Sequence, residues 1–497
     1  MTELSPMLIW PDIVLDLQDV LADHPKPIYI VGGAVRDALL RKPIKDIDLV
    51  TERDAIRLAR TIANRLGGAF YPLDPDRDVG RALIHGAAGR MVIDVAGFRG
   101  GSLEADLADR DFTINAMAVQ LQADLSRIID PLGGIRDALH KQLRRCGPNA
   151  IANDPIRALR AVRQSIQFGL RIEPETLRDV RAAAPRLHDI SPERLRDEVI
   201  KILALPRPTA ALRVADALDL LGVLFPELPP MYGLQQHPRH AFDAWNHTLA
   251  TIDALMDIIA TINPARTDEA TSQFRYGMLA IAFGNYRARL QDHLAAQFVE
   301  ERPRRALLAL AGLLHDIGKP ATVVDEAASS RFPGHAEVGA KMAEARALAL
   351  RFSSAEIDWL TTIIEHHMDG WLWIDNLSPL DAHRFWHTLG ADGIDLILFM
   401  LADYLGAVGT NLDQDRWLRL CDNGRILLET YFDRHDMIVR PPTLVDGNDL
   451  MRALNLRPGA IIRELLDVIR EAQVTGDVRT VDEALTFARR HLESRGA

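Results

Sequence analysis

The chain has 497 residues, of which 48% are hydrophobic and 26% are charged, and its formal net charge is −11. This length exceeds what one hydrophobic core usually holds and predicts about three domains. No apolar run reaches the roughly 18 residues of a membrane span, and the first residues, MTELSPMLIW, lack the basic flank of a signal peptide. Two cysteines, Cys146 and Cys421, are too few for a disulfide framework. We therefore expect a protein of the reducing cytoplasm that has no membrane partner.

The acidic average conceals a basic region. Residues 127–198 contain 14 Lys and Arg against 10 Asp and Glu, and most of the basic residues are arginines. Binding to nucleic-acid phosphates needs such local positive charge. A solvated helical surface explains the same composition, so charge alone leaves both interpretations open.

Strand-like runs are confined to the N-terminal region, at 28–31, 47–50, 81–84, 91–95 and 116–121. Helical patterns such as 54–66 fall between them, which predicts a small α/β unit of about 150 residues. All later residues have helical patterns. Proline-rich stretches at 205–209 and 225–240 indicate a boundary near 235, and VRPPTLVDG (439–447) precedes a C-terminal helical pair.

The first strand is followed by Gly32-Gly33 and a helix that carries Arg36 one turn in. Glycines let a backbone approach a phosphate closely, and a helix N-terminus offers unpaired N–H groups. Asp46 and Asp48 then lie one residue apart in a strand, so both carboxylates share a face and repel each other unless a cation lies between them. Separately these are a tight turn and two exposed acids. Together they predict a site for Mg²⁺ and a triphosphate.

Two further acids have competing interpretations. Asp94, in MVIDVAGFR, is either a third site carboxylate or an edge-strand residue that faces water, because an unpaired charge inside a sheet is costly. Asp154 before Pro155 is typical of a helix start, with Asp154 as the N-cap, and the local sequence favours that interpretation. The alternative rests on Arg157 and Arg160, which lie three residues apart on one helix face and could form an edge that reads a base and a phosphate.

Five segments follow one another in order: GGAVRD (32–37), DIDLVT (46–51), DLADRDFTINAMAV (106–119), NDPIRALRAVR (153–163) and SPERLRDE (191–198). This order resembles the class II tRNA nucleotidyltransferases, the family of bacterial CCA-adding enzymes and poly(A) polymerases. The resemblance implies an α+β fold, in which a small α/β nucleotidyltransferase head on a mixed sheet precedes all-helical regions. The implied domains are a head at 24–150, a helical neck and body at 151–235, an HD domain at 236–430 and a helical tail at 440–497.

The resemblance also implies the role of each matching residue. Asp46 and Asp48 would hold the catalytic Mg²⁺, with Asp94 as a third catalytic carboxylate. The other implied roles are triphosphate binding (Gly32, Gly33, Arg36), ribose selection (Arg110, Asp111, Asn115), base reading (Asp154, Arg157), phosphate contact (Arg160, Arg163) and support of the helical region (Glu193, Arg194).

A second set of metal-ligating residue types lies downstream. His247, His315, Asp316 and Asp403 stand at helix ends or in apolar helices and can converge on one divalent ion. His335 with either His366 or His367 would add ligands for a second ion. The segment LLHDIGKP resembles the HD metal-dependent phosphohydrolase domain, which implies a bound divalent metal whose identity the sequence does not specify. Removal of 2′,3′-cyclic or terminal phosphates from damaged tRNA ends is a hypothesis for this domain.

The resemblance implies a template-independent enzyme that adds C, A or both to the tRNA 3′ end from CTP or ATP by Mg²⁺-dependent transfer and releases pyrophosphate. Two departures from the family bear on the choice of nucleotide. Asn153 replaces the usual glutamate, and the segment after Arg99 is shorter than the flexible loop of relatives that finish with A. The second departure makes a CC-adding enzyme the nearest alternative. A poly(A) polymerase is a further alternative, although no basic RRF-type segment follows soon after the Asp46–Asp48 pair. An HD phosphohydrolase with an RNA-binding front is the alternative from another class, and the three intact carboxylates oppose it.

Overall fold

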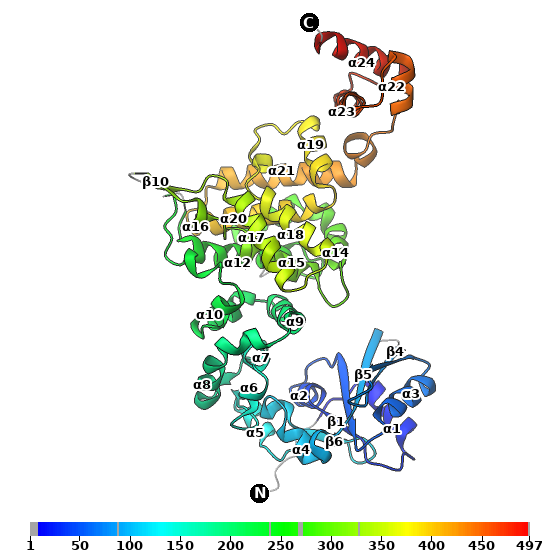
Figure 1. Cartoon of the computed structure of the whole chain (residues 1–497), viewed down its shortest axis with the longest axis vertical. Helices are drawn as coiled ribbons and strands as arrows, with labels where there is room; N and C mark the ends of the chain where they lie inside the picture. The colour runs from blue at the N-terminus through cyan, green and yellow to red at the C-terminus, as the bar shows by residue number, and fades with distance from the viewer. Residues whose placement is uncertain (1–7, 87–88, 238–239, 267–271, 327–328, 496–497) are drawn as a thin grey trace. The chain divides into compact units, whose positions relative to one another are not determined.

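The structure is a computed structural model that describes residues 8–86, 89–237, 240–266, 272–326 and 329–495. The chain forms two compact units, one of residues 1–198 and 210–224 and the other of residues 199–209 and 225–497 (Figure 1). The division into four domains stays a prediction. Among the described residues, no helix is both long enough and apolar enough to cross a membrane.

A seven-stranded mixed sheet organises the N-terminal unit, in the order β3-β4-β5-β2-β1-β6-β7. The neighbours β2 and β5 are parallel, and the other paired strands of this sheet run antiparallel. Its strands are β1 (Tyr29–Val31), β2 (Asp46–Thr51), β3 (Ala69–Asp74), β4 (Val79–Gly86), β5 (Gly89–Gly97), β6 (Ala118–Gln120) and β7 (Ile128–Ile129). The five predicted strands are present. β3 and β7 were not predicted, because β3 contains a proline and is largely exposed and β7 has only two residues.

The register of this sheet places charged residues side by side. Asp48 on β2 pairs with Val31 on one side and with Asp94 on the other, and Asp94 pairs in turn with Arg81 on β4. Paired residues point to the same face of a sheet, so Arg81, Asp94 and Asp48 form a row across three strands. Asp94 lies in an interior strand, and its interpretation as an edge-strand residue was wrong.

Helix α3 (Ala55–Arg65) covers the β3–β4–β5 side of the sheet (Figure 1). Its buried residues, including Leu58, Ala59 and Ile62, recur at helical spacing and face the strands. Gly80 permits the close approach, since a Cβ there would lie 2.9 Å from the Cβ of Ala59. The carboxylate of Asp78 accepts bonds from the first two amides of the helix, at 2.7 and 2.9 Å, and thereby fixes its start.

The N-terminal unit contains ten further helices or parts of helices in the described residues. They are α1 (Asp12–Leu21), α2 (Gly33–Leu39), α4 (Leu103–Ala108), α5 (Gly134–Leu139), α6 (Ala150–Asn153), α7 (Ile156–Phe168), α8 (Pro174–Ala182), α9 (Pro192–Leu203), α10 (Pro208–Ala217) and α11 (Leu220–Leu224). Helices α9 and α10 each have residues in both units. The prediction that everything after the head is helical was wrong in detail, because β8 (Gln142–Leu143) and β9 (Arg171–Ile172) form a short parallel pair.

The C-terminal unit is helical apart from a hairpin of β10 (Val324–Glu326) and β11 (Ser329–Arg331). Its helices are α12 (Ala244–Ile262), α13 (Phe274–Ala282), α14 (Arg287–Ala295), α15 (Arg304–Leu314), α16 (Lys319–Thr322), α17 (His335–Ala349), α18 (Ser354–His366), α19 (Pro379–Leu389), α20 (Asp392–Val408), α21 (Gln414–Phe432), α22 (Gly447–Leu454), α23 (Ala460–Thr475) and α24 (Val481–Arg495). The buried helices α12, α15 and α20 pack together at its centre (Figure 1). Gly406 on α20 allows this, because a Cβ there would lie 2.3 Å from the Thr251 hydroxyl on α12.

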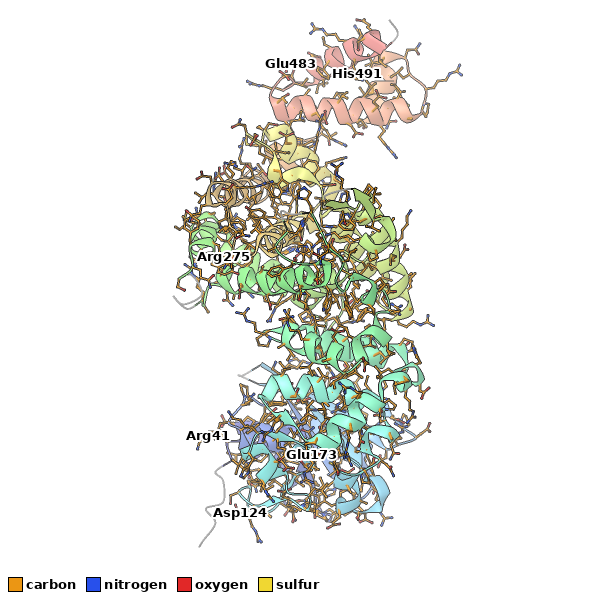
Figure 2. All side chains as sticks on the ribbon, turned by 90° about the vertical axis from the view of Figure 1, so that its left-hand side faces the viewer. Arg41, Asp124, Glu173, Arg275, Glu483 and His491 are labelled. Atoms are coloured by element: carbon orange, nitrogen blue, oxygen red, sulfur yellow. The ribbon has the colours of Figure 1, made fainter. Side chains whose placement is uncertain are left out.

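The last three helices, α22 to α24, share a small core of their own that includes Leu450, Leu465 and Ala484. Figure 2 labels Glu483 and His491 on these helices. His491 Nε2 lies 3.1 Å from Glu464 Oε1 and joins α24 to α23. Both predicted helices of the tail are present, together with α22 before them.

Candidate active sites

The turn between β1 and α2 lies against the first carboxylate site. Gly32 adopts φ 73° and ψ −131°, a conformation that favours glycine. A Cβ at Gly32 would lie 2.7 Å from Arg110 Nη1 and 3.4 Å from Asp48 Oδ2. The Arg110 guanidinium and the Asp48 carboxylate therefore both lie beside the backbone of this turn.

The carboxylates on the sheet face repel one another. Burial, together with the nearby charges of Asp46 and Asp94, raises the pKa of Asp48 to about 6, although Arg110 and Arg160 act in the opposite direction. A buried carboxylate beside two like charges is stabilised by a cation. Closely spaced carboxylate oxygens are the ligands that hard divalent ions prefer. The residues present thus fit a divalent metal site formed by Asp46 and Asp48.

Arg81 is a site residue that the sequence analysis missed. Its guanidinium forms a bidentate pair with Asp94, with Nε donating to Oδ1 at 2.7 Å and Nη2 to Oδ2 at 2.9 Å. Both side chains are about one-third exposed, at 31% and 28%. The contact follows from the β4–β5 register, which no local pattern in the sequence specifies.

Arg36 is held on the helical side of the turn. It donates to the carboxylate of Asp37 at 2.9 and 3.0 Å and to Asn115 Oδ1 at 2.5 Å. Its guanidinium also lies 4.1 Å from the ring centroid of Phe168, at the end of α7. The structure therefore brings together Arg36 and Asn115, which were both predicted to bind the nucleotide.

A buried polar network joins the RDFTIN segment to α7. Asn115 donates to Asp111 Oδ1 at 2.9 Å and to Gln164 Oε1 at 3.0 Å, and Arg160 Nη2 lies 2.9 Å from Asp111 Oδ2. Burial alone would raise the pKa of Asp111, but Arg160 and the bonds from Asn115 and the Phe112 amide hold it below its usual range. This network fixes the predicted ribose-selecting residues against the helix that carries Arg160.

Arg157 is buried and held by backbone carbonyls. Its Nη1 donates to the carbonyls of Arg110 and Ala150 at 3.2 and 3.0 Å, and its Nη2 donates to that of Asp109 at 2.7 Å. Asn153, which replaces the usual glutamate, is exposed. The three carbonyls thus orient Arg157 without a carboxylate at position 153.

Asp154 does not cap α7. The cap position belongs to Pro155 and has no side-chain hydrogen bond, so the local-sequence interpretation of Asp154 as an N-cap was wrong. Its Oδ2 instead accepts from Arg194 Nη2 at 2.7 Å and lies 3.9 Å from Arg157 Nε. Asp154 and Arg157 are therefore adjacent, as a base-reading pair requires, and Arg194 supports them.

Arg163 and Glu193 are the remaining predicted residues of the helical region. Arg163 forms an ion pair with Glu198 at 2.5 Å and donates to Gln167 at 3.0 Å, so its guanidinium is engaged within the helical region. Glu193, at the start of α9, is exposed. Phosphate contact by Arg163 stays a prediction.

A second site lies in the C-terminal unit, where α12, α15 and α20 meet. His247 Nε2 lies 3.4 Å from Asp316 Oδ2 and 3.0 Å from Asp403 Oδ1. His315 Nε2 lies 3.1 Å from Asp316 Oδ2 and 3.4 Å from Asp403 Oδ1. The four predicted HD residues thus converge from three helices, and His247, His315 and Asp316 offer ligand atoms close enough to hold one ion.

The other oxygen of Asp316 faces a second group of ligands. Asp316 Oδ1 lies 3.3 Å from His335 Nε2 and 3.8 Å from His367 Nε2, and these three residues form a second candidate metal group. His366 points elsewhere, with Nδ1 2.7 Å from Asp369 Oδ2. Of the two alternatives for this position, the structure favours His367, and Asp316 would bridge two ions.

Backbone carbonyls set the orientation of three of these imidazoles. The Nδ1 atoms of His315, His335 and His367 contact the carbonyls of residues three positions earlier, at 2.8, 2.8 and 2.6 Å. A hydrogen bond at Nδ1 leaves the Nε2 lone pair free for a metal. All three Nε2 atoms face Asp316.

The buried charges of this site fit divalent cations. Asp316 Oδ1 and His335 Nε2 are buried and make no well-directed hydrogen bond. Burial alone would lower the pKa of His315, but Asp316 and Asp403 raise it to about 10, so these carboxylates favour a positive charge at this point, which a divalent ion would supply in place of the proton. Burial and the neighbouring His315 lower the pKa of His367 to about 3, which keeps it in the neutral form that binds metals.

Lys319 and Gln236 border this site and were not identified from the sequence. Lys319 Nζ lies 2.5 Å from Asp316 Oδ2 and donates to Gln236 Oε1 at 2.6 Å. Its position three residues after Asp316 was the only signal in the sequence.

Three family models match the chain. They are the poly A polymerase head domain at residues 28–144, the probable RNA and SrmB-binding site of polymerase A at 169–231, and the HD domain at 281–408. The first match contains the carboxylates of the sheet, and the last contains all the HD ligands except His247.

Solved structures with the same fold include CCA-adding enzymes. A CCA-adding enzyme in complex with ATP aligns with a TM-score of 0.61 at 21% identity, over 97% of this chain and 96% of that one. Its complex with CTP aligns with a TM-score of 0.60 at 21% identity, over 98% and 96%. These matches establish the fold, including the mixed sheet followed by helical regions.

Two curated relatives match nearly the whole chain. The CC-adding tRNA nucleotidyltransferase of Geobacter sulfurreducens is 30% identical over 92% of this chain and 90% of its own length. The A-adding tRNA nucleotidyltransferase of Deinococcus radiodurans is 30% identical over 95% and 97%. With the carboxylate row, the glycine turn and the Asp154–Arg157 pair in place, the chain belongs to the tRNA nucleotidyltransferase family.

Proposed function

We propose that this protein adds C, or C and A, to the 3′ end of tRNA without a template, using CTP and ATP and releasing pyrophosphate. The observation that carries the proposal is the convergence of Asp46 and Asp48, the Gly32 turn and Arg110 on one face of the sheet. Mg²⁺ held by the two aspartates would lower the pKa of the attacking hydroxyl and neutralise charge on the phosphates.

In the proposed reaction the terminal 3′ hydroxyl oxygen of tRNA bonds to the α-phosphorus of the nucleotide. The bond from that phosphorus to the bridging oxygen breaks, pyrophosphate leaves, and the hydroxyl proton passes to solvent. The backbone N–H of Gly33 and the Arg110 guanidinium would hold the triphosphate, because the Gly32 N–H already donates to the Met117 carbonyl at 3.3 Å. Such transfers depend mainly on positioning and charge, which rigid strands and the buried Asp111 network supply here.

Asp154 and Arg157 form the proposed base-reading edge. Arg157 has five N–H groups, and three donate to carbonyls, which leaves two to donate to a base. Asp154 offers a carboxylate that accepts from the amino group of C or A. Because Arg157 is anchored by the backbone, its free donors point in a fixed direction and favour bases with an amino group beside a ring nitrogen.

The test is incorporation of single labelled nucleotides into tRNA transcripts that lack the whole CCA end, the last two residues or the last one. The proposal predicts addition of C to the first two substrates. Long tails of A would identify a poly(A) polymerase. No addition to any transcript would refute the proposal and favour the phosphohydrolase with an RNA-binding front.

One observation favours addition of CC alone. After Arg99 the chain forms a short turn at 99–101 and then α4, in which Asp106 holds Arg110 through two bonds of 3.2 and 3.0 Å. By the family resemblance, relatives that finish with A are expected to have a longer flexible loop at this point than this compact segment provides. The third transcript decides this point, because a CC-adding enzyme leaves it unextended with ATP present.

The HD site supports a second activity. We propose that it binds two divalent ions, bridged by Asp316, and hydrolyses phosphate esters such as 2′,3′-cyclic or terminal phosphates on tRNA ends. Such ions would activate water for attack on the ester, and Lys319 beside Asp316 is placed to contact a phosphate oxygen. Failure of the purified protein to hydrolyse 2′,3′-cAMP with Ni²⁺, Co²⁺ or Mn²⁺ supplied would exclude this activity. A cytoplasmic location, where uncharged tRNA is available, is part of the proposal.

A further inference from the structure

The row of carboxylates on the sheet ends in a positive charge. Asp48 and Asp94 are direct neighbours in the parallel register, and Asp94 has Arg81 as its partner on the far side. Asp94 acts on Asp48, since its charge contributes to the raised pKa of that residue. The Asp94 carboxylate therefore interacts with Arg81 on one side and with the site of Asp46 and Asp48 on the other.

Arg81 engages both oxygens of Asp94. The two donor distances, 2.7 and 2.9 Å, describe a bidentate pair in which each oxygen already accepts a charged hydrogen bond. A carboxylate held in this way is a weaker ligand for a cation than the unpaired Asp46 and Asp48, because part of its charge is neutralised. Together with Asp46, which lies on the same face of β2 as Asp48, the row has three carboxylates and one guanidinium and a formal charge of −2, whereas the three carboxylates alone would give −3.

On the basis of the proposed function, we propose that Arg81 is a positioning residue that neutralises Asp94 and so weakens the affinity of the head for Mg²⁺. Asp46 and Asp48 alone hold the ion, while Asp94, tethered to Arg81, shapes the field around it. Removal of the Arg81 charge makes the row more negative and tightens metal binding.

The alternative role for Arg81 is mechanical. If Asp94 were a metal ligand and Arg81 only held it in place, loss of Arg81 would disorder the ligand and weaken metal binding. The two roles thus predict opposite signs for the same substitution. Arg81→Lys separates them further, because it keeps the charge and removes the bidentate geometry.

The experiment measures, by calorimetry, how Mg²⁺ promotes binding of a CTP analogue with a non-hydrolysable α,β linkage to the full-length protein. Arg81→Met is expected to lower the Mg²⁺ concentration for half-maximal binding by about threefold to tenfold, the range for one partly exposed charge near a divalent ion. Arg81→Lys is expected to retain the wild-type value. Arg77→Met is the matched control, because Arg77 has the same charge, lies before the same strand, is 84% exposed and pairs with Asp74 away from the row.

A higher Mg²⁺ requirement in Arg81→Met, or the same requirement as in wild type, would overturn the inference. A shift of equal size in Arg77→Met would also overturn it, since overall charge would then be the cause. Analogue binding by the wild type that does not depend on Mg²⁺ would instead refute the proposed metal site of Asp46 and Asp48. That result would appear before any variant is compared, so the two failures are distinguishable.

Discussion

With the proposed two ions bound at the HD site, replacement of Asp316 by asparagine should remove both at once. Each oxygen of Asp316 faces a different group of ligands, with His247 and His315 on Oδ2 and His335 and His367 on Oδ1. The wild-type protein should therefore retain two divalent ions per chain after dialysis, and Asp316→Asn should retain none. Loss of a ligand to one ion alone, as in His367→Ala, should leave one.

The structural cost of Asp316→Asn can be estimated from the Lys319 contact. The Lys319 side chain is 7% exposed and that of Asp316 is 1% exposed, at a distance of 2.5 Å. Breaking a buried ion pair from one side typically costs about 3–5 kcal/mol. Asparagine keeps an oxygen acceptor and Gln236 keeps its bond to Lys319, so we expect a cost near the lower end, about 3 kcal/mol.

The assay is elemental analysis of dialysed protein, with circular dichroism to verify folding and thermal unfolding to measure stability. His366→Ala is the matched control, because His366 is the adjacent histidine and bonds to Asp369 outside the site. It should retain both ions. A folded Asp316→Asn protein that retains an ion, or a His366→Ala protein that loses one, would refute the bridging role of Asp316.

Two other predictions concern the head. Metal-free Asp48→Asn should be about 1–3 kcal/mol more stable than wild type at neutral pH, because the pKa of Asp48 is raised to about 6 in the folded protein. For the same reason, the free energy of unfolding of the wild type should fall as pH rises from 3.8 to 6. Denaturant unfolding at several pH values tests this, with replacement of the exposed Asp46 as the control, and equal behaviour of the two variants would contradict the prediction. Gly32→Ala should weaken CTP binding at least about tenfold, because the added methyl group displaces Arg110. The control is Gly67→Ala, which has a similar φ of 69° and nothing within 4 Å of the added Cβ, and it should lower stability alone. Equal CTP affinities of the two variants in a binding titration would show that the turn does not hold the triphosphate.

Residues close together in the sequence were predicted better than contacts between strands. The glycine turn and the Asp46–Asp48 pair follow from local spacing. The HD residues lie far apart in the sequence and were grouped by residue type and by the resemblance to the HD domain, and the structure brings them together. Arg81 could not be found in this way, because its contact with Asp94 depends on the register of β4 against β5. The choice of His367 over His366 also required helix phase at the end of α18, where a shift of one residue rotates a side chain by about 100°.

Local propensity gives a wrong prediction at Asp154. Asp before Pro is a strong helix-start signal, yet the carboxylate turns to Arg194, which is 40 residues away in the sequence. Likewise, the local sequence, with Asn153 in place of the usual glutamate, offered no partner for Arg157. The backbone carbonyls of Asp109, Arg110 and Ala150 hold it instead, and such tertiary partners are invisible to a local pattern.

The central claim is that nucleotide addition takes place at the carboxylates of the head and is chemically separate from the HD site. The most direct measurement is incorporation of labelled CTP into tRNA lacking its CCA end by two variants, Asp46→Asn with Asp48→Asn and the single Asp316→Asn. The account predicts that the head variant loses addition by at least about a thousandfold while it retains two HD-site ions, and that Asp316→Asn adds C at nearly the wild-type rate. Substantial addition by the head variant would contradict the account.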